Sequence, residues 1–205
     1  MTAPYVPTRL IDVVHLAGGR RVTLRPVLPQ DDELQQRLVR SLSPAARTQR
    51  FFAPIRELPP EWLRRMTQVD HRRHVALVAE SFDDDAPGRA ATPVGEARYV
   101  VGERDDAAEF ALVVADAWQR HGIGRRLLAS LRDHAHAAGL ARLEGEVQAG
   151  NAAMLALARR LGFELRTHPG DARLVQVVAR LGAAPCPAKP ATAAAPSAPS
   201  ASAAA

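Results

Sequence analysis

The sequence predicts a single α/β (α+β) domain built on a mixed β-sheet. Its 205 residues suit one domain, and a hydrophobic content of 47% is enough to form a core. Strand-like and helix-like patterns alternate only in the second half of the chain, which favours a sheet with both parallel and antiparallel neighbours. Regular patterns stop near Leu181, so we expect the domain to span residues 1–182.

The first half of the chain predicts one strand region and three short helices. Residues 14–27 are expected to form a short hairpin or loop that leads into a strand, with the glycine pair as its turn. A helix follows Pro29, because acidic residues suit its first turn and leucines recur at helical spacing. The second helix follows the cap Ser43-Pro44, and the third opens at Pro59-Pro60.

The second half predicts strands separated by two longer helices. Apolar runs of strand length and segments of helical periodicity distinguish them. The expected elements are strands at 74–81, 93–101 and 108–115, a helix at 122–138, a strand at 143–149, a helix at 151–162, and closing strands at 163–167 and 172–181.

The C-terminal residues 183–205 are almost wholly alanine, proline and serine, which leaves nothing to bury, and we expect a disordered tail. The one cysteine, Cys186, lies in this tail. An intramolecular disulfide is therefore excluded, and a cysteine-based zinc site is implausible. The seven histidines show no metal-ligand constellation, so we expect no metal.

The formal charge of +5 is carried almost entirely by arginine, since Lys189 is the one lysine of the sequence. No basic run is interleaved with aromatic residues, which make up only 4%, so nucleic acid is not an expected partner. No apolar run approaches membrane-spanning length, and the N-terminus lacks an apolar signal region. We expect a cytoplasmic protein without a membrane partner, and its oligomeric state stays open.

The segment QRHGIGRR, Gln119–Arg126, joins an expected strand to an expected helix and favours a phosphate-binding turn. Its glycines allow a ligand to approach the backbone closely, and the helix N-terminus offers unpaired N–H groups with a partial positive charge. A P-loop is rejected, because no lysine or magnesium-binding hydroxyl follows the glycines. The dinucleotide fingerprint lacks its third glycine. The loop alone is also compatible with an ordinary glycine turn bearing surface arginines.

Two motifs in order resemble those of the GNAT N-acetyltransferases. Gln119-Arg-His-Gly122-Ile-Gly124 is similar to their Q/R-x-x-G-x-G/A acetyl-CoA loop, and NAAMLALARRLGF, residues 151–163, looks like their next motif. The stretches RPVLPQDDE, SLSPAARTQRFF, MTQVD and GEVQAGNAAMLALARRLGF together resemble the acetyltransferase domain of bacterial Pat-type protein lysine acetyltransferases. The resemblance, from about Arg21 to Val178, implies the GNAT fold: a mixed central sheet of about six to seven strands, splayed at the acetyl-CoA site and flanked by helices.

The resemblance implies direct transfer of an acetyl group from acetyl-CoA to an amine. The strand before the loop would bind the acetyl carbonyl and pantetheine arm through Leu112 and Val114, with Val113 between them, although this run also reads as plain core strand. Asn151 would contact the arm or the sulfur, and it is equally suited to cap a helix. The loop amides of His121 to Arg125 would take the pyrophosphate. The loop residues expected to bind the cofactor are Gln119, Arg120, His121, Gly122, Ile123, Gly124 and Arg125.

Transfer to a lysine needs a general base, because deprotonating that amine at neutral pH costs about 4–5 kcal/mol. Glu109, a lone carboxylate in the apolar strand AEFALVVA, is the expected base, and it matches the glutamate of the Pat-type pattern. Partial burial would raise its pKa, whereas a glutamate near a strand start is often merely exposed. Glu96 is the second choice. Glu144 and Glu146 are expected to be structural.

The acceptor follows only from the resemblance, which favours a protein lysine, with an acyl-CoA synthetase as one candidate substrate. A small amine and a non-catalytic acyl-CoA-binding or sensing role are the alternatives. Many members of the family carry a tyrosine seven residues after the motif asparagine, which acts as a general acid. Ala158 occupies that position here. The thiolate is therefore expected to leave without a protein donor or to take its proton from solvent.

Overall fold

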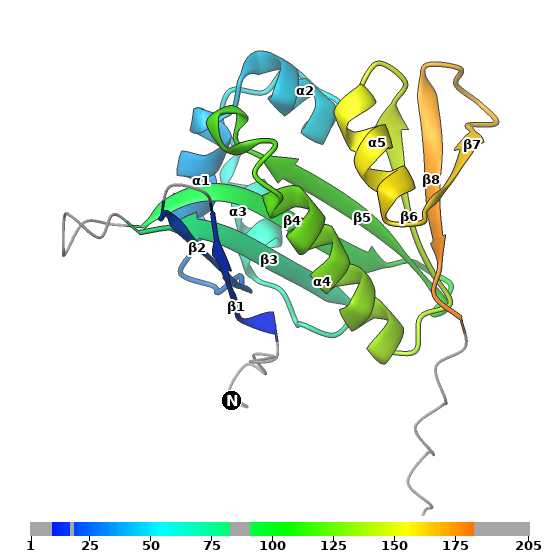
Figure 1. The fold of residues 1–205 in the computed structure, drawn as a ribbon, viewed down its shortest axis with the longest axis horizontal. Helices are drawn as coiled ribbons and strands as arrows, with labels where there is room; N and C mark the ends of the chain where they lie inside the picture. Colours follow the sequence, from blue (N-terminus) through cyan, green and yellow to red (C-terminus); the bar gives the residue numbers. More distant parts are fainter. Residues whose placement is uncertain (1–9, 17–18, 83–90, 183–205) are drawn as a thin grey trace, which may run out of the picture.

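The computed structural model describes residues 10–16, 19–82 and 91–182, and these form one eight-stranded mixed sheet flanked by helices (Figure 1). The strand order is β1-β2-β3-β4-β5-β6-β8-β7. Among the strands of the described residues, only β5 and β6 are parallel neighbours, and the other neighbours run antiparallel. The predicted mixed α/β class is confirmed, while the predicted tail at 183–205 lies outside the described residues.

The elements follow the predicted order, with one additional strand. The strands are β1 (Asp12–His15), β2 (Arg21–Pro26), β3 (His74–Ser81), β4 (Thr92–Val101), β5 (Ala107–Val114), β6 (Arg142–Gln148), β7 (Glu164–Thr167) and β8 (Leu174–Arg180). The helices are α1 (Asp32–Ser41), α2 (Pro44–Phe51), α3 (Pro60–Thr67), α4 (Ile123–Ala137) and α5 (Ala152–Arg160), and η2 (Asp116–Trp118) is a 3₁₀ turn. The described sheet has eight strands instead of six to seven, because β1 pairs with β2 along its whole length.

The main core lies between the sheet and helices α4 and α5, which cover the face turned to the viewer in Figure 1. Leu127, Leu128 and Leu131 of α4 are fully buried, as their helical spacing predicts. Burying each such side chain contributes about 1.5–3 kcal/mol. Helices α1 and α3 pack together, and α1 lies against β4. Helices therefore cover both faces of the middle of the sheet, with α4 and α5 on one face and α1 and α3 on the other.

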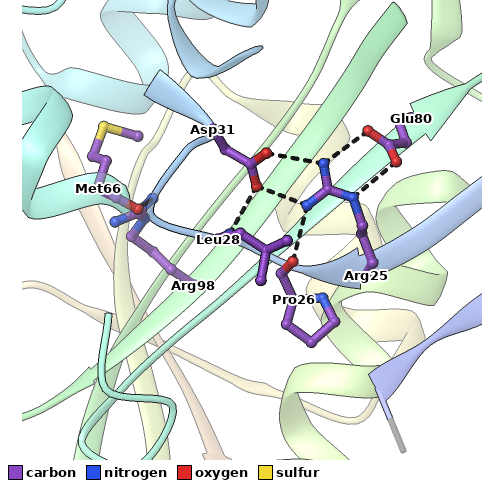
Figure 2. Close-up of polar contacts among 7 residues, drawn as sticks. All are labelled: Arg25, Pro26, Leu28, Asp31, Met66, Glu80 and Arg98. Carbon is purple, nitrogen blue, oxygen red and sulfur yellow. Dashed lines mark hydrogen bonds and ion pairs between the residues drawn. The ribbon is translucent and has the colours of Figure 1, made fainter. Parts of the chain in front are cut away.

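Arg25 fixes the start of α1 to the sheet (Figure 2). Its guanidinium donates to both oxygens of Asp31 at 2.7 and 3.0 Å, and to both oxygens of Glu80 at 2.8 and 3.1 Å. Asp31 also accepts the backbone N–H of Leu28 at 2.7 Å. These bonds join β2, β3 and the N-cap of α1, so the helical segment that follows starts from a fixed point.

Helix α2 is held at two points, one just after the end of β5 and one at the end of β6. Ser43 caps it by accepting the N–H of Ala46 at 3.2 Å, and the Ser43 hydroxyl and N–H both donate to Asp116 at 2.8 Å. The Gln148 side chain at the end of β6 donates to the Thr48 carbonyl oxygen at 3.3 Å. Asp116 follows β5, so α2 connects the ends of β5 and β6 from the face opposite α4 and α5.

Candidate active site

The sheet opens between β5 and β6. These strands pair only from Ala107 to Glu109, after which β5 stays with β4 and β6 stays with β8. Gly145 of β6 makes room at the point of divergence, because a Cβ there would lie 3.0 Å from the Phe110 ring and carbonyl oxygen. The Phe110 ring packs edge-on against Phe163 with centroids 5.5 Å apart. The splayed sheet that the sequence predicted is therefore present, and Phe110 occupies its apex.

The backbone N–H and C=O groups of every second residue of β5 point toward this gap. The Ala115 N–H donates to Val94 of the β4 side at 2.9 Å, so Val113, two residues earlier, also faces β4. Leu112 and Val114 consequently face the gap. The Val114 carbonyl oxygen accepts a hydrogen bond from the Gln119 side chain at 3.1 Å. Within the described part of the chain, the N–H groups of Leu112 and Val114 have no strand partner on that side, because the pairing of β5 with β6 ends at Glu109.

A cleft of about 680 Å³ runs along the gap. Its walls come from β5, the loop before α4, helix α5, helix α2 and β6. The predicted site residues that line it are Glu109, Leu112, Val113, Val114, Gln119, Arg120, Gly122, Gly124, Arg125 and Asn151. The Ile123 side chain is instead buried in the main core, and His121 is exposed on the loop outside the cleft walls.

The loop has the geometry of an anion-binding helix start. Gly122 is the N-cap of α4 with φ at 84°, a left-handed conformation that glycine adopts without strain, and Arg120 also has a positive φ of 62°. The first N–H groups of α4 have no acceptor within the helix. Gly124 lets α4 approach α5, because a Cβ there would already touch the Leu157 side chain at 3.4 Å. Backbone donors and Arg125 thus meet at the end of the cleft.

Asn151 and Ala158 occupy different environments on α5. The Asn151 side chain caps the helix by accepting the Met154 N–H at 3.1 Å, and the residue also lines the cleft. Ala158 is fully buried and packs in the main core. Position 158 therefore places no proton donor in the cleft.

Glu109 lies at the apex of the gap on the α2 side of the sheet, the side on which Val113 packs with α1 and α2. Its side chain is solvent-exposed within the cleft. Partial desolvation, together with the nearby carboxylates of Glu146 and Glu144, raises the pKa of Glu109. A carboxylate with a raised pKa is a stronger base.

Glu96, the second choice as base, is an internal ion. Its side chain is 1% exposed and accepts from Arg98 on one oxygen and from Arg50 on the other, the latter at 3.1 Å. Burial would raise its pKa, but the two guanidiniums outweigh it and hold the pKa of Glu96 below its usual value. Both oxygens are engaged, so Glu96 is unsuited to accept a proton from a substrate.

The structure adds cleft residues that the sequence did not identify. Arg50 reaches the cleft from α2, and Arg160 reaches it from α5. Glu146, expected to be structural, lines the cleft and lies 3.1 Å from His168 Nε2. Glu144 is the register partner of Glu109, and strand alternation puts Glu146 on the same face as Glu144. The sequence shows this alternation but not the register between β5 and β6. No local pattern marks Arg50, because its partner Glu96 is 46 residues away.

Residues 40–163 match the acetyltransferase (GNAT) family. The chain belongs to this family. This GNAT protein is 32% identical to an acetyltransferase of Pseudomonas aeruginosa over 169 residues, which cover 82% of the chain and 88% of that relative. It is 30% identical to the acetyltransferase Pat of Mycolicibacterium smegmatis over 151 residues, which cover 73% of the chain and 43% of Pat. The resemblance to Pat therefore concerns less than half of that protein.

Among solved structures, the GNAT domain of S. lividans PAT superposes with a TM-score of 0.75, covering 86% of the chain and 99% of that domain at 23% identity. The predicted GNAT fold is confirmed. The GNAT protein is an acetyl-CoA-dependent acetyltransferase. Within the described residues, no three histidine, cysteine, aspartate or glutamate side chains are grouped to hold a metal ion. No helix of the described part has the length and apolar character to cross a membrane.

Proposed function

We propose that the protein transfers the acetyl group of acetyl-CoA to the side-chain amine of a lysine in another protein, with Glu109 as general base. The observation that carries this proposal is the place of Glu109, at the last paired position before β5 and β6 separate. Its carboxylate is exposed inside the cleft, where an amine that enters from solvent can reach it. The 30% identity to the acetyltransferase Pat over 73% of the chain supports acetyl transfer, and the sequence resemblance to Pat-type protein lysine acetyltransferases favours a lysine acceptor.

The donor would lie along the gap between the strands. The N–H groups of Leu112 and Val114 face this gap, where they can donate to the thioester carbonyl and to the amides of the pantetheine arm. The N-terminal amides of α4, beginning after Gly122, suit the pyrophosphate, and Arg125 adds a full positive charge. Asn151 can contact the arm through its amide nitrogen, because its oxygen already caps α5.

The proposed reaction is a direct displacement. The acceptor nitrogen forms a bond to the acetyl carbonyl carbon, and the carbon–sulfur bond breaks with its electron pair leaving on sulfur. Glu109 takes the proton that the amine releases. A positioned general base contributes about 10²–10⁴-fold to such a step. The thiolate then takes a proton from solvent, because Ala158 offers none.

The deciding experiment incubates the purified protein with isotopically labelled acetyl-CoA and a protein lysate, and maps labelled acetyl-lysines by mass spectrometry. The isotope separates new acetylation from earlier modification. Glu109→Gln is compared with Glu103→Gln, which changes an exposed glutamate that does not line the cleft. We expect a small set of labelled lysines with the wild type and with Glu103→Gln, and their loss with Glu109→Gln.

A different acceptor would give a different result. If no protein is labelled while free amines are acetylated in a Glu109-dependent manner, the protein-lysine assignment is wrong and the acceptor is a small molecule. If acetyl-CoA binds and raises the melting temperature but nothing is acetylated, the catalytic role of Glu109 is wrong as well. Labelling that persists in Glu109→Gln would leave the base unassigned and contradict the mechanism.

A further inference from the structure

A buried cluster of three ionised side chains lies beside the cleft. Glu96 of β4 is bonded to Arg98 of the same strand and to Arg50 of α2, and the side chains are 1%, 9% and 10% exposed, respectively. Arg98 has further partners, since it donates to the Met66 carbonyl oxygen at 3.1 Å and lies 3.0 Å from His74 Nε2. Figure 2 shows Arg98 directed toward Met66, away from the Arg25 network. Arg98 is therefore fully engaged in holding the fold.

The cluster carries one positive charge more than it can neutralise internally. Two guanidiniums face one carboxylate, and His74 adds no negative charge. Burial and the nearby Arg98 lower the pKa of His74 to about 4, so it is neutral at pH 7. An unbalanced charge in a nine-tenths buried group is costly unless an anion compensates it. The excess charge needs a partner from outside the cluster.

Arg50 is the member of the cluster that reaches the cleft. Only its Nη2 atom is bonded to Glu96, and its buried Nε–H has no hydrogen-bond partner among the described residues. The groups that act on Glu109 are Glu146 and Glu144 from β6 and Arg50 from α2; only Arg50 lowers the pKa of Glu109. Arg50 and Glu109 therefore interact across the same cleft.

Building on the proposed function, we infer that Arg50 is a second catalytic residue, whose guanidinium, positioned by Glu96, stabilises the negative charge that develops on the thioester oxygen and sulfur. Before transfer, Arg50 faces the ionised Glu109. As the amine proton passes to Glu109, that carboxylate becomes neutral while an equal negative charge forms on the acetyl group and the sulfur. This role therefore requires the Arg50 guanidinium to lie nearer the thioester oxygen and sulfur than the Glu109 carboxylate, because only then does it stabilise the transition state more than the ground state.

This assignment also gives the departing thiolate a stabilising side chain, which position 158 of α5 does not provide. Position 158 is a buried alanine, so no side chain there can meet the departing thiolate. A fixed guanidinium on the opposite wall stabilises the same charge without giving up a proton, because arginine stays protonated at all working pH values. Glu96 is a positioning residue in this scheme, since it acts only through Arg50.

The test measures single-turnover acetyl transfer across pH for Arg50→Gln, Arg50→Lys and Arg47→Gln, with coenzyme A affinity and melting temperature measured for each. Arg47 lies on the same helix and is not among the cleft residues, so its variant controls for loss of charge on α2. Arg50→Gln leaves Glu96 and Arg98 as a balanced pair, so we expect it to fold. Arg50→Met takes its place if the glutamine variant is unfolded.

We expect the plateau rate at high pH to fall about 100-fold in Arg50→Gln, the scale of one lost oxyanion-hole donor. Coenzyme A affinity should stay within about threefold. Arg50→Lys should recover at least about tenfold of the loss, and Arg47→Gln should stay within about threefold of the wild type. These results together support a catalytic charge at position 50.

Two results would overturn the inference, and they are distinguishable. If the wild type transfers no acetyl group to any amine, the proposed function fails and the role of Arg50 fails with it. If the wild type transfers acetyl and Arg50→Gln keeps the wild-type plateau, only the Arg50 inference is wrong. In that second case a shift of the acid limb to higher pH would show that Arg50 merely lowers the pKa of Glu109.

Discussion

Glu109 and Glu144 are register partners at the last position shared by β5 and β6. Up to this pair the two strands form a continuous parallel ladder, and beyond it they separate around Phe110 and Gly145. The carboxylate proposed as the base is thus attached to the last rigid point of the sheet, beside backbone donors that have no strand partner. Rigid attachment keeps a base in position while leaving the gap free for a ligand.

The pH dependence of transfer should report the raised pKa of Glu109. The base works only when ionised, so kcat/KM should fall as the pH drops through that pKa, at a higher pH than an ordinary carboxylate would give. Glu146→Gln removes a negative neighbour, lowers the pKa of Glu109 and should move this acid limb to lower pH. A pH–rate profile of both proteins checks the shift. An unmoved limb would mean that another group titrates.

The glycine at position 122 should be required for coenzyme A binding. Gly122→Asp places a side chain on a left-handed residue and a carboxylate at the helix start, where it opposes phosphate. Calorimetry should show affinity for coenzyme A lowered at least about 100-fold. Gly139→Asp is the matched control, because Gly139 has a similar φ of 83°, an equally open surrounding and lies just past the other end of α4. Equal losses in both variants would point to strain instead of the loop.

The glycine at position 145 should be needed for the opening of the sheet. In Gly145→Ala the added methyl group would overlap the Phe110 ring and carbonyl oxygen, and overpacking of this kind costs about 1–3 kcal/mol. Gly150→Ala, where a Cβ has open space, should change the free energy of unfolding by about 0.5 kcal/mol or less. Denaturant unfolding measures both. A neutral Gly145→Ala would show that the apex is loosely packed.

The carboxylate of Glu96 should be important for stability. Glu96→Gln leaves two buried guanidiniums without their counter-charge, and we expect a loss of about 3–5 kcal/mol in the free energy of unfolding. Glu57→Gln, which breaks an exposed ion pair with Arg40, should cost about 1 kcal/mol or less. Equal effects of the two substitutions would contradict the buried-ion interpretation.

The same residue predicts a pH window for stability. The pKa of Glu96 is lower in the folded protein than in the unfolded chain, so its contribution is fully present above the unfolded value of about 4.3. It should be lost as the pH falls through the lower, folded pKa. Unfolding curves between pH 6 and about pH 3 should show this loss in the wild type and a much flatter dependence in Glu96→Gln.

The sequence by itself determined most of the elements, the loop before α4 and the residue that we propose as the base. The helical spacing of apolar residues, the glycines that mark turns and the alternation along strands are local properties, and each depends on residues within a few positions of one another. Leu127 and Leu131 were therefore recognisable as core, and Glu109 as an unusual carboxylate in an apolar strand. The β1 strand was less clear, because residues 14–27 were compatible with either a loop or a hairpin.

Only the tertiary structure decided which charges meet. Arg50 lies on α2, whereas Glu96 and Arg98 lie on β4, and the sequence offered Glu96 as a second base when it is an internal counter-ion. The separation of β5 from β6 likewise depends on Phe110 packing over Gly145, a contact between strands with α4 between them in the chain. Electrostatic energy depends on the distance between charges and on their burial, and a linear sequence contains neither. The interactions among the charged residues of the cleft could therefore be identified only from the tertiary structure.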